Sequence, residues 1–261
     1  MDETSVKDEI RLLLEPDLLR HIATLKALAR HPSVQTKLIH RADEWALLTM
    51  RPTSASNWDN VNYPSSKAVA FIDGNNVEYK IALLDEVPME STVIKTYDEK
   101  IISYLKSRGV KKATAFISFT DPGHTKFTEM DEKVEKSSQL KPEIGGLLAQ
   151  GGYSSEELSW HFSKGASWFG VRIDGRVASA CFVYQNYLNV WEIGGLYTDS
   201  EHRRLGLARL NVSAAIQYLR GKNKTIRFQV SEGNEASRQL ARSAGLLEFL
   251  RICHLHYDAC Q

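Results

Sequence analysis

Apolar side chains recur with the spacing of a helix over residues 6–30, and Pro16 interrupts the run. Because proline suits the first turn of a helix and not its interior, two successive helices are expected there. Farther along, short apolar stretches bounded by turn residues predict strands, with one helix among them. The predicted strands are "WALLTM" (45–50), "AVAFID" (68–73), "VEYKIALL" (77–84) and "ATAFISF" (113–119), and the helix covers about 97–107.

Residues 121–150 depart from this pattern. The stretch contains a Pro-Gly pair, a mixed-charge run "EMDEKVEKSSQLKPE" and few apolar positions. This composition favours a connection between two folded parts. We therefore expect an amino-terminal domain over residues 1–130, a linker over 131–152 and a carboxy-terminal domain over 153–261.

The carboxy-terminal half shows a similar alternation of strands and helices. Its predicted strands are 168–173, 177–184, 189–198 and 225–231, its predicted helices are 154–165, a segment ending near 220, and 234–245, and an apolar run closes the chain at 246–257. Residues 71–84 resemble 172–183, and residues 104–118 resemble 218–231. These likenesses indicate two copies of one unit rich in β-α-β elements.

Composition excludes several classes of protein. The hydrophobic share is 43%, the charged share is 25% and the formal net charge is +1, as in an ordinary globular protein. A charge so near zero gives no electrostatic case for nucleic-acid binding, and no run of about 18 apolar residues predicts a membrane span. The polar, acidic start is unlike a signal peptide, and Cys181, Cys253 and Cys260 lack metal-ligand spacing. We expect a cytoplasmic protein with no nucleic-acid or membrane partner and no metal.

The stretch "HRRLGLARLN" (202–211) combines small residues with positive charge where a helix begins. The first amide groups of a helix have no internal partner and attract anions. Gly206 and Ala208 would allow a phosphate to approach closely, and Arg203, Arg204 and Arg209 would add charge. By itself the pattern also fits a plain helix start with solvated arginines. The glycines at 194 and 195, in the preceding strand, suggest a bulge or a close backbone approach.

Two motifs together resemble the GNAT N-acetyltransferase superfamily. The first is the R/Q-x-x-G-x-G/A loop that holds the coenzyme A pyrophosphate, matched by Arg203, Gly206 and Ala208. The second is a strand followed by an Asn-capped helix, matched at Asn234, Ala236, Leu240, Gly245 and Leu246. The resemblance covers about residues 150–261. It implies an α/β fold with a mixed sheet.

The arrangement in two halves is similar to the glycine N-acyltransferase-like branch of that superfamily. There, two GNAT-like halves follow each other and only the second carries the pyrophosphate loop. Residues 85–98 contain no R-x-x-G-x-A motif, which agrees with such a layout.

The resemblance also implies roles for individual residues. Glu192 is expected to act as general base on the acceptor amine, directly or through water; its alternative is an outward-facing carboxylate that keeps the strand polar. The amide of Leu196 is expected to polarise the thioester carbonyl, and Asn234 to contact the cofactor, cap its helix, or both. The complete cofactor-binding set expected is Leu196, Tyr197, Thr198, Arg203, Arg204, Leu205, Gly206, Leu207, Ala208, Arg209 and Asn234.

One position departs from the family pattern. A tyrosine that serves as general acid often follows the leucine matched by Leu240, and here that position is Ala241. Tyr257 or Tyr197 is expected to replace it, unless the thiolate leaves unaided. His254 and His256 alternate on the last strand, and with no third ligand nearby they are expected to form a polar face.

The sequence therefore predicts an N-acyltransferase that moves an acetyl group from acetyl-CoA to a primary amine of a small molecule or amino acid. Two alternatives remain open: an enzyme that acetylates a protein or peptide, and a non-catalytic module that binds coenzyme A. A homodimer is compatible with the sequence, which leaves the oligomeric state undetermined.

Overall fold

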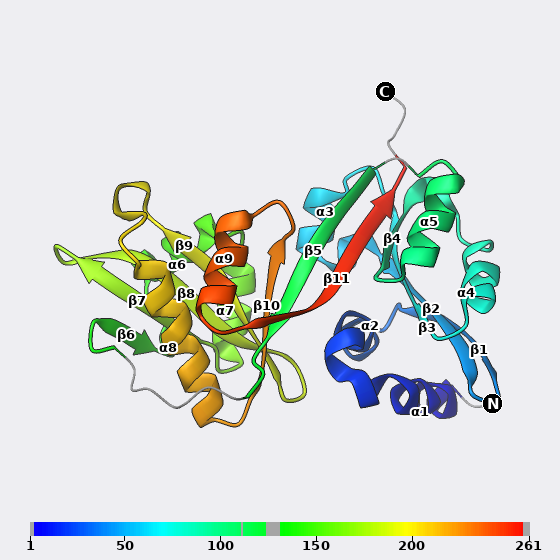
Figure 1. The fold of residues 1–261 in the computed structure, drawn as a ribbon, viewed down its shortest axis with the longest axis horizontal. Helices are drawn as coiled ribbons and strands as arrows, with labels where there is room; N and C mark the ends of the chain where they lie inside the picture. The colour runs from blue at the N-terminus through cyan, green and yellow to red at the C-terminus, as the bar shows by residue number, and fades with distance from the viewer. Residues whose placement is uncertain (1–2, 111, 124–130, 258–261) are drawn as a thin grey trace. The chain divides into compact units, whose positions relative to one another are not determined.

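The computed structural model describes residues 3–110, 112–123 and 131–257, which form two compact units (Figure 1). Unit 1 comprises residues 1–116 and 250–261, and unit 2 comprises residues 117–249. Strands β5 (Lys112–Thr120) and β11 (Leu247–His256) each contribute residues to both units. This grouping differs from the expected division near residue 130, and the domain boundaries stay a prediction.

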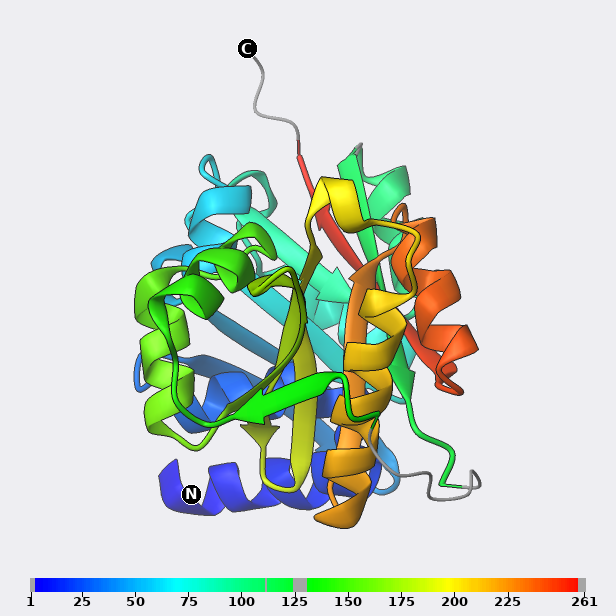
Figure 2. The same ribbon diagram turned by 90° about the vertical axis from the view of Figure 1, so that its left-hand side faces the viewer.

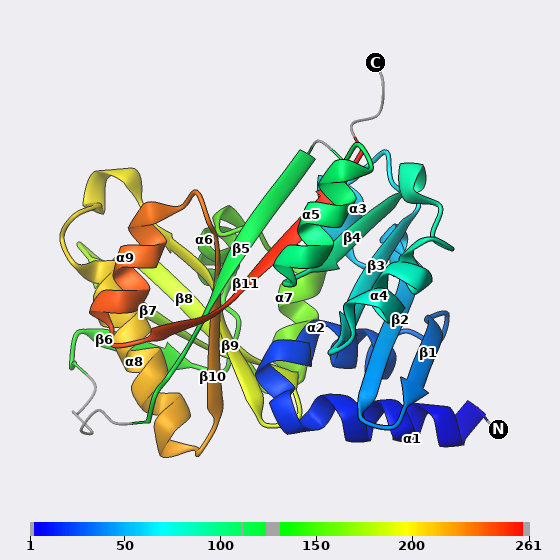
Figure 3. The same ribbon diagram turned by 45° about the vertical axis from the view of Figure 1, so that its right-hand side comes forward.

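Unit 1 begins with two helices separated by a short 3-10 turn, as the break at Pro16 predicts. Its strands follow the order β1-β2-β3-β4-β11-β5. Its helices are α1 (Glu3–Leu14), α2 (Leu18–Arg30), α3 (Asn57–Asn62), α4 (Val77–Leu84) and α5 (Glu99–Ser107), and its remaining strands are β1 (Gln35–Arg41), β2 (Glu44–Pro52), β3 (Ala68–Gly74) and β4 (Thr92–Thr96). Helices α4 and α5 lie on one face of β2, β3 and β4 (Figure 3).

The segment "VEYKIALL" is helix α4, so the strand predicted there is wrong. The side chain of Asn76 accepts a hydrogen bond from the Tyr79 amide at 2.9 Å and caps the helix. Buried positions 80, 83 and 84 then recur with helical spacing. An Asn cap directly before an apolar run is a helix-start signal that outweighs the strand propensity of its β-branched and aromatic residues.

Unit 2 has the strand order β5-β10-β9-β8-β7-β6. Figure 2 shows α6 and α7 on one side of these strands and α8 and α9 on the other. The helices are α6 (Pro142–Gln150), α7 (Ser155–Ser163), α8 (Leu207–Gly221) and α9 (Glu235–Ser243), and the strands not yet given are β6 (Val134–Ser137), β7 (Ser167–Ile173), β8 (Arg176–Tyr187), β9 (Val190–Thr198) and β10 (Thr225–Ser231). The expected linker thus contains β6 and α6.

The two units repeat one order of elements. Three antiparallel strands are followed by a helix that crosses to a parallel strand: β1, β2, β3, α4 and β4 in unit 1, and β7, β8, β9, α8 and β10 in unit 2. The prediction of two copies is confirmed, but its segment pairing is wrong. Residues 71–84 form a strand and helix, whereas residues 172–183 lie in a hairpin.

The parallel strands separate at the same place in both units. Pairing of β3 with β4 stops at Phe71 and Lys95, and pairing of β9 with β10 stops at Ile193 and Phe228, after four residue pairs in each case. In unit 2, β9 continues to Thr198 and β10 to Ser231 beyond the last pair. A gap between two strands therefore opens next to the turn that leads into α8.

Candidate active site

The turn between β9 and α8 leaves the start of α8 open. Gly206 is the N-cap residue, has a left-handed φ of 81°, and has no atom within 4 Å of where a Cβ would stand. No side chain caps the helix. Because the amides of the first turn have no partner inside the helix, an anion can approach them directly.

Arginines surround this helix start. Arg203, Arg204 and Arg209 are exposed. The Nε of Arg203 donates to the carbonyl oxygen of Thr198 at 3.2 Å, and its guanidinium carbon lies 5.8 Å from the centre of the Tyr197 ring. Arg203 is thereby held against the end of β9, while Arg204 adopts a left-handed φ of 67° within the turn.

The glycine pair in β9 forms a bulge, as the sequence suggested. The β8–β9 register shifts between Phe182 opposite Gly194 and Ala180 opposite Tyr197, so two residues of β9 face Cys181 alone. Gly195 takes a left-handed φ of 61° in this bulge. One edge of β9 pairs with β8 here, and the other edge faces the gap beside β10, where an extended ligand can add as a strand would.

A buried polar chain fixes the end of β9 to α8. Thr198 Oγ1 lies 2.7 Å from Ser179 Oγ, and Asn211 Nδ2 of α8 donates to the same Ser179 oxygen at 2.9 Å. Asn211 and Ser179 are fully buried. The chain sets the position of the strand end relative to the open helix start.

Helix α6 reaches the same bulge. A Cβ atom at Gly151 would lie 2.6 Å from the carbonyl carbon of Gly195, so the two backbones are in direct contact. Beside this contact, a Cβ at Gly194 would lie 2.3 Å from the hydroxyl of Tyr153. The expectation that these strand glycines mark a close approach is confirmed.

Glu192 lies on β9 just before the bulge and is only 8% exposed. Arg227 Nη1 donates to its Oε2 at 2.7 Å, and Asn186 Nδ2 donates to the same oxygen. The alternative of an outward-facing, solvated carboxylate is therefore wrong. Both of these bonds go to Oε2, and among the residues that the structure describes none donates to Oε1.

Asn234 and Tyr257 make local contacts. The Asn234 side chain caps α9 by accepting from the Ser237 amide at 3.1 Å, so the capping role is confirmed and a cofactor contact stays a prediction. Tyr257 belongs to unit 1, where its hydroxyl donates to the carbonyl oxygen of Arg108 at 2.6 Å. Its role as general acid stays a prediction, as does that of Tyr197.

The two histidines lie on the same side of β11, as expected, but His254 is buried among the rings of Trp58, Tyr63 and Phe116 and does not form a polar face. His254 Nδ1 lies 2.6 Å from the Tyr63 hydroxyl, and His256 stacks edge-on against the same ring. In the described part of the chain, no three His, Cys, Asp or Glu residues form a group suited to a metal ion. Cys181 is fully buried, and burial raises the pKa of its thiol. Cys260 lies outside the described residues.

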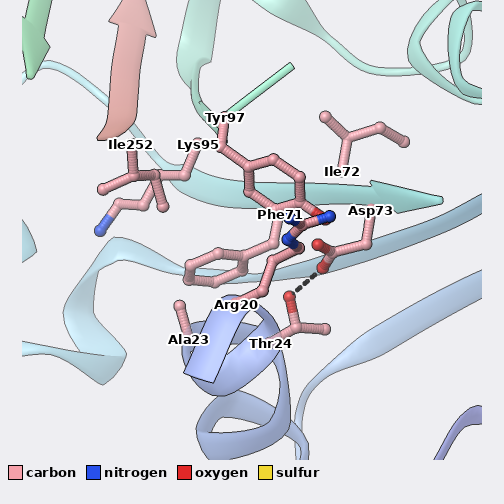
Figure 4. Close-up of a pocket in the computed structure, with 9 residues that line it drawn as sticks. All are labelled: Arg20, Ala23, Thr24, Phe71, Ile72, Asp73, Lys95, Tyr97 and Ile252. Carbon is pink, nitrogen blue, oxygen red and sulfur yellow. Dashed lines mark hydrogen bonds between the residues drawn. The ribbon is translucent and has the colours of Figure 1, made fainter. Parts of the chain in front are cut away.

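At the corresponding place in unit 1, side chains of the unit itself leave a pocket of about 10 Å³ (Figure 4). The turn from β3 into α4 is short, and Asn76 caps the helix. Beyond the last β3–β4 pair, Asp73 accepts a hydrogen bond from Thr24 (Figure 4). Asp73 also lies 2.9 Å from Nδ1 of His21. Beside Asp73, the guanidinium of Arg20 lies over the Tyr97 ring, with its central carbon 5.5 Å from the ring centre. Within the described residues, unit 1 thus has a capped helix start and, beyond β3 and β4, only this small pocket.

Sequence reasoning missed the polar partners around Glu192. Arg227 on β10, Asn186 on β8 and the tyrosines at 153 and 184 belong to no motif. The alternation of side chains along β8 indicates one of these neighbours. Tyr184 stands directly opposite Glu192, so the two side chains lie on the same face of the sheet.

Comparison with known proteins identifies the segment that holds these features. The model of the acetyltransferase (GNAT) family matches residues 141–246. A comparison with curated proteins found no match. No described helix is long and apolar enough to cross a membrane.

Solved structures share the fold over most of the chain. A GCN5-related N-acetyltransferase from Kribbella flavida is 16% identical, with 91% of this chain and 94% of that chain covered and a TM-score of 0.55. A GNAT-family acetyltransferase from Colwellia psychrerythraea is 11% identical, with 93% and 97% covered and a TM-score of 0.55. A tandem GNAT protein from the clavulanic acid biosynthesis pathway is 11% identical, with 92% and 88% covered and a TM-score of 0.53.

At such identities the likeness concerns the fold alone, and it confirms the expected fold class of a mixed α/β sheet with tandem GNAT-like halves. The motifs at the start of α8 and at α9 both lie within the matched segment. Residues 141–246 of this chain are therefore a domain of the acetyltransferase (GNAT) family.

Proposed function

We propose that unit 2 is an acetyl-CoA-dependent N-acyltransferase that acylates a primary amine of a small molecule or an amino acid. The observation that carries this proposal is the junction of the β9–β10 gap with the uncapped start of α8. The family match over residues 141–246 supports acyl transfer from a coenzyme A thioester as the chemistry.

The residues present fit the two ends of coenzyme A. The pyrophosphate would bind the first-turn amides of α8, where Gly206 leaves open space, with Arg203, Arg204 and Arg209 neutralising its charge. The pantetheine arm would pair with the open edge of β9 over residues 196–198. The Leu196 amide, turned by the bulge, would then donate to the thioester oxygen.

Glu192 is the candidate base. An amine attacks in its neutral form, which a free α-amine with a pKa near 8 supplies in part at neutral pH. It then loses a further proton as the amide forms, so a proton acceptor helps. Arg227 and Asn186 fix the Glu192 carboxylate through Oε2. Oε1 would take the amine proton, directly or through one water.

No general acid is needed in this scheme. Ala241 is fully buried and brings no hydroxyl to the position where the family often has tyrosine. A thiol with a pKa of about 8.5 is a tolerable leaving group, so the thiolate would depart with its electron pair and be protonated by solvent.

The same alanine favours a second candidate, a module that binds coenzyme A without catalysis. Such a module would bind acetyl-CoA and release no thiol with any amine. An acceptor amine on a protein or peptide is the other form of the enzyme hypothesis. It predicts turnover of lysine-containing or free-amino-terminal peptides in preference to small amines.

The test is a calorimetric titration of acetyl-CoA into the wild type, Gly206→Asp and Gly175→Asp. Both glycines have left-handed φ values and open space, so the substitutions match in strain and charge. We expect micromolar binding to the wild type and Gly175→Asp, and none to Gly206→Asp. Absence of binding to folded wild type would overturn the proposal.

A measurement of thiol release from acetyl-CoA with a panel of amines then distinguishes the N-acyltransferase from the non-catalytic module. We expect release to depend on the amine and to fall strongly in Glu192→Gln. Binding of acetyl-CoA without release from any amine or peptide would favour the non-catalytic module.

A further inference from the structure

Tyr153 is held in place from both sides in the loop between α6 and α7. On its amino-terminal side, the backbone of Gly151 touches that of Gly195. On its carboxy-terminal side, Ser154 and Glu157 form a capping box, with hydrogen bonds of 2.9 and 3.2 Å. Tyr153 therefore has little freedom, and the backbone of the loop aims its side chain.

The Tyr153 ring packs edge-on against the Phe182 ring, with 4.9 Å between the ring centres. The Tyr153 hydroxyl lies over Gly194. Glu192 and Gly194 are two residues apart on β9, so they present the same sheet face. That face carries the Glu192 carboxylate, the start of the bulge and the hydroxyl of Tyr153. All three lie where β9 parts from β10.

Tyr184 supports this hydroxyl. It stands opposite Glu192 in the β8–β9 register, and its oxygen lies 3.1 Å from that of Tyr153. Burial, reinforced by the Glu192 charge, raises the pKa of both phenols, so both stay protonated and neutral. A phenol oxygen has two lone pairs, and the bond to Tyr184 occupies at most one in Tyr153.

We propose that Tyr153 Oη accepts one N–H of the acceptor amine and, together with Glu192, makes the site selective for primary amines. The inference rests on the proposed function, because it needs the thioester carbonyl at the bulge. A neutral primary amine has two N–H groups and one lone pair. One N–H faces Tyr153, the other faces Glu192 Oε1 or its water, and the lone pair then points to the carbonyl carbon.

The acyl transfer needs no reactant besides the amine and the thioester. The nitrogen lone pair forms the C–N bond, the C–S bond breaks, and its electrons leave with the thiolate. One amine proton passes to Glu192 Oε1. The second stays on the product amide and keeps its hydrogen bond to Tyr153. A secondary amine has one N–H, so it loses either the bond to Tyr153 or the path to the base.

The experiment measures thiol release with matched amine pairs: benzylamine with N-methylbenzylamine, and glycine with N-methylglycine. The variants are Tyr153→Phe, which retains the ring packing, and Tyr184→Phe, which retains the Tyr153 oxygen. Tyr218→Phe is the control, since this tyrosine lies on α8 and packs against Phe169, in the core on the other sheet face.

We expect the wild type to prefer the primary amine of a pair. Tyr153→Phe should lower kcat/KM for that amine about tenfold or more and leave the N-methyl amine within about twofold. Tyr184→Phe should have the smaller effect, Tyr218→Phe none, and the Kd of acetyl-CoA should stay unchanged in all three.

Two results would overturn the inference alone: Tyr153→Phe as active as the wild type, or an equal loss with both amines of a pair. A wild type that binds acetyl-CoA and releases no thiol with any amine would instead contradict the proposed function. The two failures are thus distinguished by the wild-type reaction.

Discussion

Gly151 at the end of α6 and Gly195 in the bulge of β9 touch through their backbones, with 2.6 Å between a Cβ added to the first and the carbonyl carbon of the second. Two glycines far apart in the sequence therefore meet at one point. The contact joins the loop that carries Tyr153 to the strand that carries Glu192, and it makes the shape of the candidate site depend on the absence of a methyl group.

Replacement of Gly151 by alanine tests this contact. The φ of Gly151 is −80°, which alanine adopts without strain, so any cost comes from the clash. We expect Gly151→Ala to lower the free energy of unfolding by about 1–3 kcal/mol and to weaken acetyl-CoA binding. Denaturant titration measures the first effect and calorimetry the second.

Gly146, inside the same helix, provides the matched control. A Cβ there would meet nothing within 4 Å, so Gly146→Ala should raise the free energy of unfolding by about 0.5–1 kcal/mol through helix propensity. If both substitutions stabilised the protein, the close approach at Gly151 would be refuted.

Each chain should bind one acetyl-CoA. In unit 1, Asn76 caps α4, and the side chains of Asp73, Thr24 and Tyr97 lie at the gap beyond β3 and β4. We expect a calorimetric stoichiometry near one, abolished by Gly206→Asp. Asn76→Ala should cost about 1 kcal/mol of stability and leave the Kd unchanged. A second equivalent of cofactor bound to the wild type would contradict this.

The buried pair of Glu192 and Arg227 should be costly to break from one side. Both side chains are at most 10% exposed, and their closest atoms are 2.7 Å apart. We expect Arg227→Met to lower the free energy of unfolding by about 3–5 kcal/mol, because an unpaired buried carboxylate remains. The double variant with Glu192→Gln should recover part of that loss.

A double-mutant cycle measured by denaturant unfolding gives the coupling between the two residues. Strict additivity of the two single effects would mean that the carboxylate and the guanidinium do not interact in the folded chain.

Acidification should destabilise unit 1 through His254. Burial, with Lys95 and His256 nearby, holds the pKa of His254 well below its usual range, and Nδ1 of the neutral ring lies 2.6 Å from the Tyr63 hydroxyl. The unfolded chain therefore binds a proton that the folded chain does not, and the stability is present above about pH 6.5 and lost below it.

We expect a loss of about 1.4 kcal/mol per pH unit below that value from this residue. His254→Phe should be less stable at pH 7.5 and should show a flatter dependence between pH 7.5 and 5.5. Unfolding titrations at both pH values check this, and equal slopes for wild type and variant would contradict it. The pKa of His31 is also lowered, chiefly by partial burial. Its effect on the pH dependence of stability is the same in the wild type and in His254→Phe, so it cancels in the comparison.

The sequence carried enough information for most elements of unit 2, but not for β6 and α6, which lie in the expected linker. The helix start at Gly206 and the cap at Asn234 follow from local backbone chemistry, so short motifs predict them. The bulge was indicated by its two glycines for the same reason. At α4 the apolar run fitted strand and helix alike, and only the Asn76 cap distinguishes them.

The surroundings of Glu192 could not be predicted in this way. Arg227 reaches Glu192 because β10 pairs with β9. Tyr153 reaches Gly194 because Gly151, directly after α6, contacts the backbone of Gly195. Both contacts depend on tertiary register, which no local pattern encodes. The wrong pairing of the two repeats has a similar origin. Residues 71–84 and 172–183 share turn residues, but the turn leads into a helix in the first segment and into a strand in the second.

Strand β11 has a consequence for how the protein is made. Its residues 253–255 pair with residues 94–96 of β4, and the Tyr63 hydroxyl bonds to a histidine 191 positions later in the chain. During synthesis the first unit therefore lacks an interior strand of its sheet until the ribosome has passed through the whole second unit. Folding of the first part has to wait for the last, and a nascent chain exposes the edge of β4 in the meantime.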